Sequence, residues 1–120
     1  MNVCWRTNMD KLLIVWKTDN ETDIHNFVVP YAYNAKKQQW FDQVDVLIWG
    51  ASQEIVASTP LIQQRVLNLV KNEINVYACK MCADNLGVSE TLEKLGVHVQ
   101  YTGDFLSEKL KDPDYKVLTL

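Results

Sequence analysis

Glycine is scarce in this chain, with four in 120 residues, and that scarcity excludes the common phosphate-binding loops. The loop after the first apolar run, KTDNETD at residues 17–23, contains none. Neither GxGxxG nor GxxxxGK(S/T) occurs, so no glycine-rich backbone can closely approach a nucleotide phosphate. The sequence therefore predicts no nucleotide site, and we expect no cofactor.

Clusters of positive charge and long apolar runs are also missing. Twelve basic side chains against fifteen acidic ones give a net charge of −3, and no stretch concentrates enough Lys or Arg to neutralise a row of phosphates. The apolar runs are far shorter than the roughly 18 residues needed to cross a bilayer. The start, MNVCWRTNMDK, lacks the layout of a secretory signal. We expect a cytoplasmic protein that binds neither nucleic acid nor membrane.

Cysteine is the third scarce residue type, with three in the chain, and an odd number argues against a disulfide framework. Two of them, Cys79 and Cys82, form a CxxC pair in the stretch YACKMCADNLG. In a reducing compartment such a close pair is more often catalytic or metal-binding than a structural disulfide. The pair is therefore the first candidate for a functional site.

Five short apolar runs, rich in Val, Ile or aromatic residues, recur along a chain whose length suits one domain. Their pattern is typical of strands that are buried on both faces of a parallel sheet. The runs are Leu12 to Trp16, Val44 to Trp49, Ile74 to Ala78, Val97 to Tyr101 and Tyr115 to Leu120. We expect a single domain over residues 11–120, and a tail or an oligomer contact over residues 1–10.

Segments with helical spacing separate these runs, and they are long enough for the crossovers that parallel strands require. The first, Asp23 to Gln39, has Thr22 or Asp23 as its predicted N-cap, and Pro30 should kink it or delay its start. Its predicted buried stripe is Ile24, Phe27, Val28, Tyr31 and Ala35, and that of the helix from Pro60 to Asn72 is Leu61, Ile62, Val66, Leu69 and Val70. The other predicted helices are Gln53 to Ala57, Met81 to Leu86, Phe105 to Leu110 and Ser89 to Gly96, the last with Ser89 as its N-cap and Gly96 as its left-handed stop.

This alternation predicts an α/β fold: a three-layer sandwich around a five-stranded, mostly parallel sheet of the flavodoxin-like kind. Ligands in such folds bind at the carboxyl ends of the strands. The predicted site is therefore built from Lys17 to Thr22, Gly50 to Ser52, Cys79 to Asp84 and Thr102 to Asp104.

The chemistry of the cysteine pair has several interpretations. A thiol at a helix N-terminus is favoured as thiolate, and Lys80 adds to that effect whereas Asp84 opposes it. The pair resembles a thioredoxin-type redox couple, although such couples usually follow an earlier strand. Both cysteines could instead be small buried hydrophobic residues. Half of a zinc site is a poor interpretation, because Cys4, His25 and His98 have no ligand spacing, and we expect no metal.

Four segments in the same order resemble the DsrE/DsrF-like family, which includes TusD and YchN. They are VVPYAYNAKKQQW, DVLIWGAS, ACKMCADNLGV and YKVLTL, and the resemblance spans roughly residues 10–120. It implies a DsrEFH-like α/β subunit that assembles as a homo-oligomer, a trimer or a hexamer. Several members of the family relay persulfide sulfur, which they carry on a cysteine after the third strand.

The resemblance assigns the sulfur-acceptor role to Cys79, because the family cysteine lies eight residues before a glycine, as Cys79 lies before Gly87. Cys82 matches a second cysteine of the YchN-like branch, and Asn85 and Leu86 stand where the relay subunits have Arg. Two short segments are expected to wall the pocket: Lys80, Met81 and Ala83 around the thiols, and Gly50, Ala51 and Ser52 opposite them.

The expected function is thus a sulfur carrier or sulfurtransferase accessory subunit that uses Cys79 as persulfide acceptor, with Cys82 as either a resolving thiol or a wall of the pocket. Its partners would be sulfur-donor and sulfur-acceptor proteins. The alternatives are a non-enzymatic oligomeric module that binds a ligand or a protein, and a thiol–disulfide redox protein. Large aromatic residues, Trp5, Trp40 and Tyr101, are candidates for the oligomer interface or for the core.

Overall fold

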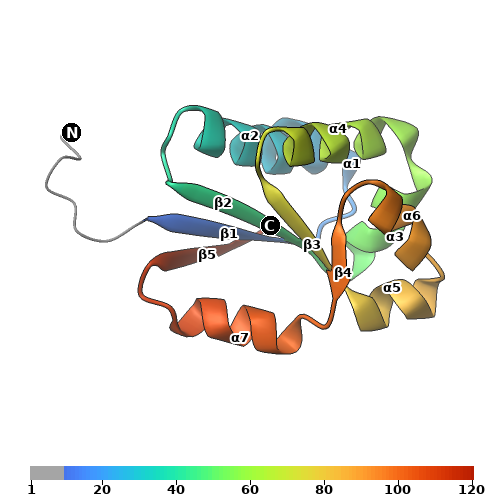
Figure 1. The fold of residues 1–120 in the computed structure, drawn as a ribbon. Coiled ribbons are helices and arrows are strands. Elements are labelled where there is room, and N and C mark those ends of the chain that lie inside the picture. The colour runs from blue at the N-terminus through green and yellow to red at the C-terminus, as the bar shows by residue number, and fades with distance from the viewer. Residues whose placement is uncertain (1–9) are drawn as a thin grey trace, which may run out of the picture.

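The computed structural model describes residues 10–120, so the segment expected as a tail or an oligomer contact lies outside the described residues except for Asp10. Five parallel strands form one sheet in the order β4-β3-β2-β1-β5 (Figure 1). The strands are β1 (Lys11–Trp16), β2 (Gln43–Ile48), β3 (Asn75–Cys79), β4 (His98–Gln100) and β5 (Tyr115–Thr119). The α/β class and all five strands are confirmed, and the sheet is wholly parallel rather than mostly so.

The helices follow the predicted connections. They are α1 (Glu21–Asp23), the π-helix η1 (Ile24–Val28), α2 (Val29–Lys37), α3 (Ala51–Ser58), α4 (Pro60–Lys71), α5 (Lys80–Leu86), α6 (Ser89–Lys94) and α7 (Gly103–Lys111). In the described part of the chain, no helix is both long enough and apolar enough to cross a membrane.

The strand order explains why the two faces of the sheet are covered unequally. The chain steps in one direction from β1 to β4, and it then returns to the other edge to place β5 beside β1. Because parallel crossovers are right-handed, reversing the direction moves the connecting helix to the other face. Accordingly α2 and α4 cover one face, and α7 lies under the other (Figure 1).

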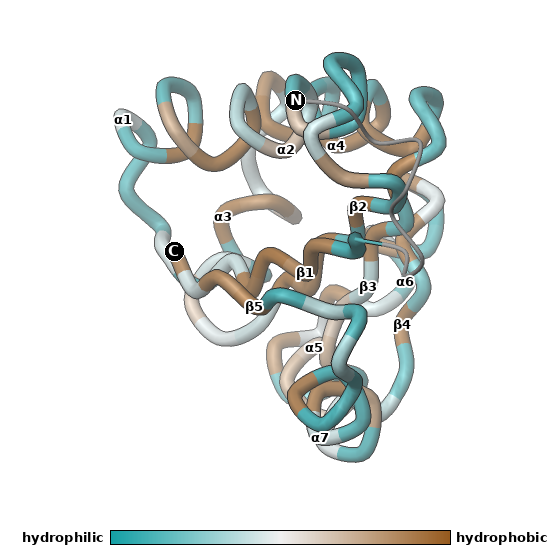
Figure 2. The backbone as a smooth tube through the Cα atoms, turned by 90° about the vertical axis from the view of Figure 1, so that its left-hand side faces the viewer, coloured by the Kyte–Doolittle hydropathy of each residue, from teal (hydrophilic) through white to brown (hydrophobic). Residues whose placement is uncertain are grey.

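The core is divided in the same way. The larger cluster lies on the face that α2 and α4 cover, and it includes Trp16, Ile48 and Leu69. The smaller cluster lies on the face of α7, where Leu13 and Leu47 pack with partly buried neighbours. Figure 2 shows the apolar central strands between these layers. The strands thus end between a thick helical layer, which includes α2 and α4, and a thin one formed by α7.

The first crossover differs from its predicted form, because Pro30 widens the helix instead of kinking or delaying it. The helix begins at Glu21 with Asn20 as its N-cap, not Thr22 or Asp23, and the Asn20 Oδ1 atom accepts a 3.0 Å hydrogen bond from the Asp23 N–H. Proline lacks an N–H, and its ring clashes with the carbonyl four residues earlier in an α-helix. The π-turn at Ile24–Val28 avoids that clash.

Two predicted stripe residues are exposed instead of buried. The extra residue in the π-turn rotates the apolar face, so Phe27 is 48% exposed, whereas Ile24, Val28 and Ala35 are buried as predicted. On α4, Leu61 is 52% exposed, because it shares a helix face with Arg65 and Asn68, whereas Ile62, Val66 and Leu69 form the buried face. Both exposed side chains lie on the outer surface of the larger helical layer.

Candidate functional site

Cys79 stands where β3 ends and α5 begins. It is the last residue of the strand and the N-cap of the helix, with φ −71° and ψ 117°. An N-cap residue in this extended conformation lies next to the free N–H groups of the first helical turn. Its carbonyl accepts a 2.9 Å hydrogen bond from the Gln53 Nε2 atom on α3. Cys79 is only 4% exposed, so the protein encloses nearly all of it.

The site lies where the sheet connections diverge. β3 leads into α5 and α6, whose Ala83 and Leu92 belong to the larger core, whereas β4 leads into α7, whose Phe105 packs in the smaller core. In open α/β sheets, such a divergence creates the crevice in which ligands bind. Thr102, the N-cap of α7, lies beside Cys79 where β3 and β4 end. The strand order is thus a physical reason to expect a ligand site at these strand ends, which stays a prediction.

The surroundings of Cys79 favour its thiolate. Burial by itself raises the pKa of the thiol, but hydrogen bonding to the sulfur outweighs burial and lowers the pKa below its ordinary value. The Cys82 N–H is the strongest of these donors, followed by the Thr102 hydroxyl, the Cys82 thiol and the Met81 N–H. Cys79 therefore ionises more readily than a free cysteine does, although it is nearly buried.

Cys82 has the opposite tendency. Burial raises the pKa of its thiol, and its hydrogen bond to Cys79 and the charge of that thiolate raise it further. Interactions with Trp49 and with the Gly50 backbone oppose the rise without cancelling it. Two neighbouring thiols whose pKa values are driven apart can divide the roles of nucleophile and proton donor. As the pH rises, Cys79 is therefore expected to ionise before Cys82.

A cavity of about 400 Å³ opens beside this pair. Its lining comes from the loop after β1, from the start of α3 and from α5, and consists of Asp19, Gly50, Ala51, Glu54, Cys82, Asn85 and Leu86. Of the two thiols, Cys82 is the one in that lining, among the residues that the structure describes. A molecule in the cavity therefore meets Cys82 directly and Cys79 behind it. Two exposed carboxylates, those of Asp19 and Glu54, stand in the same lining.

Of the six residues that were predicted to wall the pocket, two line the cavity beside Cys82. Gly50 and Ala51 line the cavity, and Gly50 adopts φ +76°, a backbone conformation that favours glycine. Ser52 is buried, and its hydroxyl donates to the carbonyls of Trp16 and Trp49, so it fixes the ends of β1 and β2.

The three predicted wall residues from α5 take other positions. Lys80 forms a 2.9 Å ion pair with Asp84, four residues further along the helix. Met81 is 58% exposed, and Ala83 is buried in the larger core. Lys80 is therefore paired with Asp84 rather than with Cys79, and the thiolate at Cys79 is stabilised chiefly by hydrogen bonds.

Two buried polar residues next to Cys79 carry atoms that lack a hydrogen-bond partner within the described part of the chain. They are Thr102, at its Oγ1 atom, and Gln53, at its Oε1 atom. The Thr102 hydroxyl nevertheless lies near enough to the Cys79 sulfur to favour its thiolate. Buried polar atoms without partners are costly, and neither residue lines the cavity beside Cys82. Thr102 falls within a predicted strand-end segment, whereas sequence reasoning missed Gln53.

Glu54, Asn85 and Leu86 were also missed as lining residues. The one signal for Glu54 is its position on the first turn of the helix that follows Gly50 and Ala51. Asn85 and Leu86 follow Cys82 by three and four residues, the spacing that places side chains on one face of a helix.

The two histidines belong to other helices and strands than the cysteine pair does. His25 is in η1, and His98 begins β4, where its ring lies 5.3 Å from that of Tyr77. Over residues 10–120, no group of three or more His, Cys, Asp or Glu side chains is arranged to hold a metal ion. Cys4, which was weighed as a ligand, lies outside the described residues.

Two solved structures share this architecture. A conserved protein of unknown function from Bacteroides thetaiotaomicron, BT1422, is 36% identical, with a TM-score of 0.89, over 92% of this chain and 95% of that one. The ychN protein from E. coli is 19% identical, with a TM-score of 0.70, over 93% of this chain and 100% of that one. The resemblance to YchN, and with it the DsrE/DsrF-like fold, is confirmed. The chain matches no protein-family model and no curated protein.

Proposed function

The chain belongs to the family of the conserved Bacteroides thetaiotaomicron protein BT1422, and from its cysteine pair we propose that it is a sulfur carrier or a sulfurtransferase accessory subunit. One observation carries the proposal: two neighbouring thiols have pKa values shifted in opposite directions, and one of them lines a cavity. In this proposal Cys79 accepts the sulfur and Cys82 meets the donor first.

The loading step is an ordinary thiol exchange with one additional sulfur atom. The Cys79 thiolate attacks the terminal sulfur of a donor persulfide, R–S–SH, and forms a new S–S bond. The donor's S–S bond breaks, and R–S⁻ leaves with the electron pair. The product on the protein is the persulfide Cys79–S–SH. No change in the total oxidation state occurs, so the step needs neither oxidant nor reductant.

The surroundings of the sulfur suit each stage of this step. The N–H groups of Met81 and Cys82 and the Thr102 hydroxyl stabilise a negative sulfur before the attack. They can stabilise an ionised persulfide in the same way afterwards. Cys82, whose raised pKa keeps it protonated, can give its proton to the departing R–S⁻.

Sulfur can leave Cys79 by two balanced routes. An acceptor thiolate can attack the outer sulfur, which restores the Cys79 thiolate and makes a persulfide on the acceptor. Alternatively, the Cys82 thiolate can attack the inner sulfur, which forms a Cys79–Cys82 disulfide and expels HS⁻. The first route makes the protein a carrier, and the second makes Cys82 a resolving thiol.

Intact mass after incubation with a small persulfide donor tests this proposal. The wild type should gain the mass of one sulfur atom, and Cys79→Ser should not. Cys82→Ser should still load and should keep its sulfur longer, because the resolving thiol is gone. A wild type that gains no sulfur from any donor, or a Cys79→Ser variant that loads as the wild type does, would contradict the assignment.

A thiol–disulfide redox function is the second candidate, because the Cys82 thiol is close enough to the Cys79 sulfur to form a hydrogen bond with it. That function predicts a disulfide between them that a dithiol reductant opens and an oxidant closes reversibly. Persulfide loading without such a reversible disulfide would favour the carrier. Ordinary, slow alkylation of both thiols, with no loading, would leave a non-enzymatic binding module.

Assembly into a trimer or a hexamer is also proposed. Two of the aromatic residues considered as interface candidates, Trp40 and Tyr101, are 53% and 70% exposed, whereas Trp5 lies outside the described residues. Large exposed aromatics are enriched where proteins meet. Light scattering should give a mass of several subunits, and the mass of a single chain would contradict the proposal.

A further inference from the structure

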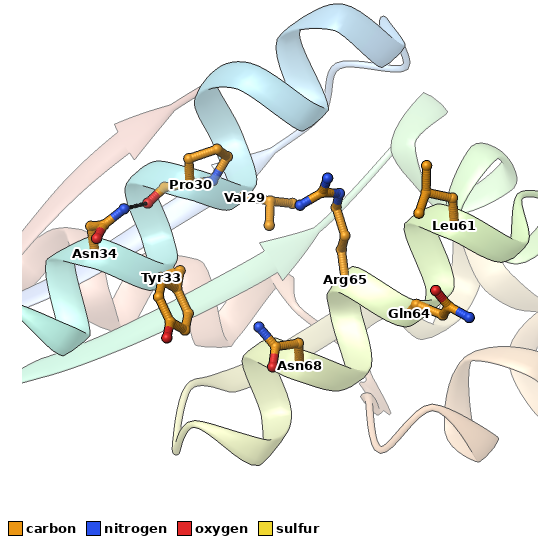
Figure 3. A pocket seen from close by; sticks show the side chains of 8 residues that line it. All are labelled: Val29, Pro30, Tyr33, Asn34, Leu61, Gln64, Arg65 and Asn68. Atoms are coloured by element: carbon orange, nitrogen blue, oxygen red, sulfur yellow. Dashed lines mark hydrogen bonds between the residues drawn. The ribbon is translucent and has the colours of Figure 1, made fainter.

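A second cavity, of about 440 Å³, lies between α2 and α4, on the outer surface of the larger helical layer (Figure 3). Its volume falls within the range of small-molecule sites, about 300 to 1,000 Å³. Its lining comes from other residues than those that line the cavity beside Cys82. Whatever it binds is therefore independent of the cysteine chemistry proposed above.

Arg65 gives this cavity its charge. Its side chain extends from α4 toward Val29 and Pro30 on α2 (Figure 3). The Nε atom is shielded from solvent, and it has no hydrogen-bond partner among residues 10–120. No described carboxylate forms an ion pair with this guanidinium, and the cavity lining includes no acidic residue. A positive group thus stands partly desolvated and without an acceptor.

Neutral donors surround the guanidinium. The Asn68 Oδ1 atom accepts from the Asn72 amide at 3.2 Å, which leaves the Asn68 N–H₂ group available to a ligand. Gln64 also lines the cavity, one residue before Arg65. A guanidinium offers its N–H donors as a planar fork that matches the two oxygens of a carboxylate. The polar side of the cavity therefore suits a planar anion.

Apart from Tyr33 and Asn34, the rest of the lining is apolar. Val29, Pro30 and Leu61 lie beside the guanidinium, and Leu61 is one of the exposed side chains that the predicted stripe had placed inside. An apolar group on the ligand would cover these side chains and remove apolar surface from water. From the charge and from the apolar lining together, we propose that the α2–α4 cavity binds an organic carboxylate with an apolar body.

Benzoate and its uncharged analogue benzamide form a matched pair of probes for this site. In a titration followed by ¹⁵N NMR, benzoate should shift the Arg65 Nε–H signal and the backbone signals of α2 and α4 in a saturable way. The sequence has only two arginines, so the Arg6 side-chain signal is the internal reference. Benzamide should bind about tenfold more weakly or not at all, because it lacks the charge that pairs with the guanidinium.

Substitutions on α4 test whether benzoate binds at Arg65. Arg65→Gln should lose benzoate binding, whereas Lys71→Gln, which removes a cation from α4 outside the cavity lining, should retain it. If Arg65→Gln does not fold, Asn68→Asp serves instead, because an acid three residues from Arg65 on the same helix can occupy the guanidinium and should weaken benzoate binding. A Cys79→Ser/Cys82→Ser double variant should bind as the wild type does.

Three results would overturn the proposal. The first is an Arg65 signal that does not move with benzoate at concentrations where the signals of α2 and α4 do. The second is equal binding of benzoate and benzamide. The third is binding of inorganic phosphate as tight as that of benzoate, since phosphate has no apolar body to place on Val29 and Leu61.

Discussion

Thr102 is the residue whose effect on Cys79 can be isolated most cleanly, because its Oγ1 atom is buried and has no other partner in the described chain. Thr102→Val keeps the shape of the side chain and removes the hydroxyl. We expect the pKa of Cys79 to rise, because the thiolate loses one of its hydrogen bonds. The midpoint of a pH profile of iodoacetamide labelling at Cys79 should move to higher pH.

Thr119→Val, on the exposed side of β5, is the control and should leave that midpoint unchanged. An unchanged midpoint in Thr102→Val would mean that the backbone N–H groups and Cys82 account for the whole shift.

The carboxylates of Asp19 and Glu54 should determine which reagents reach Cys82. Both stand in the lining of its cavity, so an anionic reagent should meet repulsion that a neutral one does not. In an Asp19→Asn/Glu54→Gln variant, labelling of Cys82 by iodoacetate should accelerate a few-fold relative to labelling by iodoacetamide. The gain should shrink at high salt, because exposed charges are screened.

Glu93→Gln/Glu108→Gln, which neutralises two exposed carboxylates outside the cavity lining, is the matched control. An equal gain in that control would assign the effect to the net charge of the protein rather than to the cavity.

Sequence reasoning could place the residues whose position depends on local structure. Cys79 ends a strand, and Gly50 and Ala51 follow one, so the apolar runs alone located them. Gln53 could not be found in this way, because its hydrogen bond joins it to a residue 26 positions away. Thr102 was placed at a strand end, but its contact with Cys79 depends on which strands are neighbours.

At the scale of elements, α5 holds the N–H groups that face Cys79, and Gly87 ends that helix in the left-handed conformation, with φ +71° and ψ 29°. A Cβ atom at Gly87 would meet no atom within 4 Å, so Gly87→Ala tests the backbone conformation alone. We expect the free energy of unfolding to fall by about 1 kcal/mol, measured by urea denaturation.

Gly103→Ala is the control for that substitution. Gly103 begins α7 without a positive φ, and a Cβ there would also meet no atom within 4 Å. Its stability should stay the same or rise slightly, because alanine restricts the unfolded chain. Equal losses in the two variants would show that the left-handed conformation at Gly87 is not the cause.

The sequence predicted which segments are helices and which are strands. It did not predict every N-cap or the π-turn, because hydrophobic periodicity does not specify them. Gly96 has φ +85°, as its predicted role at the end of a helix requires, whereas the N-cap of α6 is Val88 and not Ser89. A π-turn has no sequence signature beyond a proline in the wrong place, so Pro30 predicted a disturbance but not its form. That form decided which side of the helix Phe27 occupies.

At the scale of the whole molecule, a buried polar network ties the strands together at the end of the sheet opposite the cysteines. Asp45 on β2 is 1% exposed, and it accepts hydrogen bonds from Tyr115 on β5 at 2.6 Å and from Asn75 at 3.1 Å. Gln43 bonds to both the Asp45 carboxylate and the Tyr115 hydroxyl. The network bridges β1 and connects the return strand to the centre of the sheet.

Tyr115→Phe should lower the free energy of unfolding by about 1.5 to 3 kcal/mol at neutral pH, because a buried carboxylate loses a donor. Burial, and then the hydrogen bond and charge of Asp45, raise the pKa of Tyr115 above its ordinary value of about 10. A raised pKa contributes stability that is complete below pH ~10 and is lost as the pH rises above it. Wild-type stability should therefore fall in alkaline urea titrations.

Tyr115→Phe should show a smaller alkaline loss than the wild type, and Tyr101→Phe, at a residue that is 70% exposed, should match the wild type. An alkaline loss of the same size in Tyr115→Phe would assign the pH dependence to other groups.

The overall class of the fold could be predicted because each strand is a separate short apolar run. The strand order could not, since nothing in a run such as Tyr115–Thr119 specifies that it pairs with β1 rather than β4. Strand order is also what creates the divergence between β3 and β4. The strand-end location of the candidate site could therefore be predicted, whereas the shape of its cavity required the tertiary structure.

The most direct test of this account is the ultraviolet absorbance of thiolate as a function of pH, measured for a protein that carries Cys4→Ser, so that only the pair remains, and for its Cys79→Ser and Cys82→Ser variants. The account predicts one ionisation below the ordinary cysteine value of about 8.5, absent from Cys79→Ser, and a second ionisation above that value, absent from Cys82→Ser. A Cys4→Ser protein without a low ionisation, or a low ionisation that survives Cys79→Ser, would contradict it.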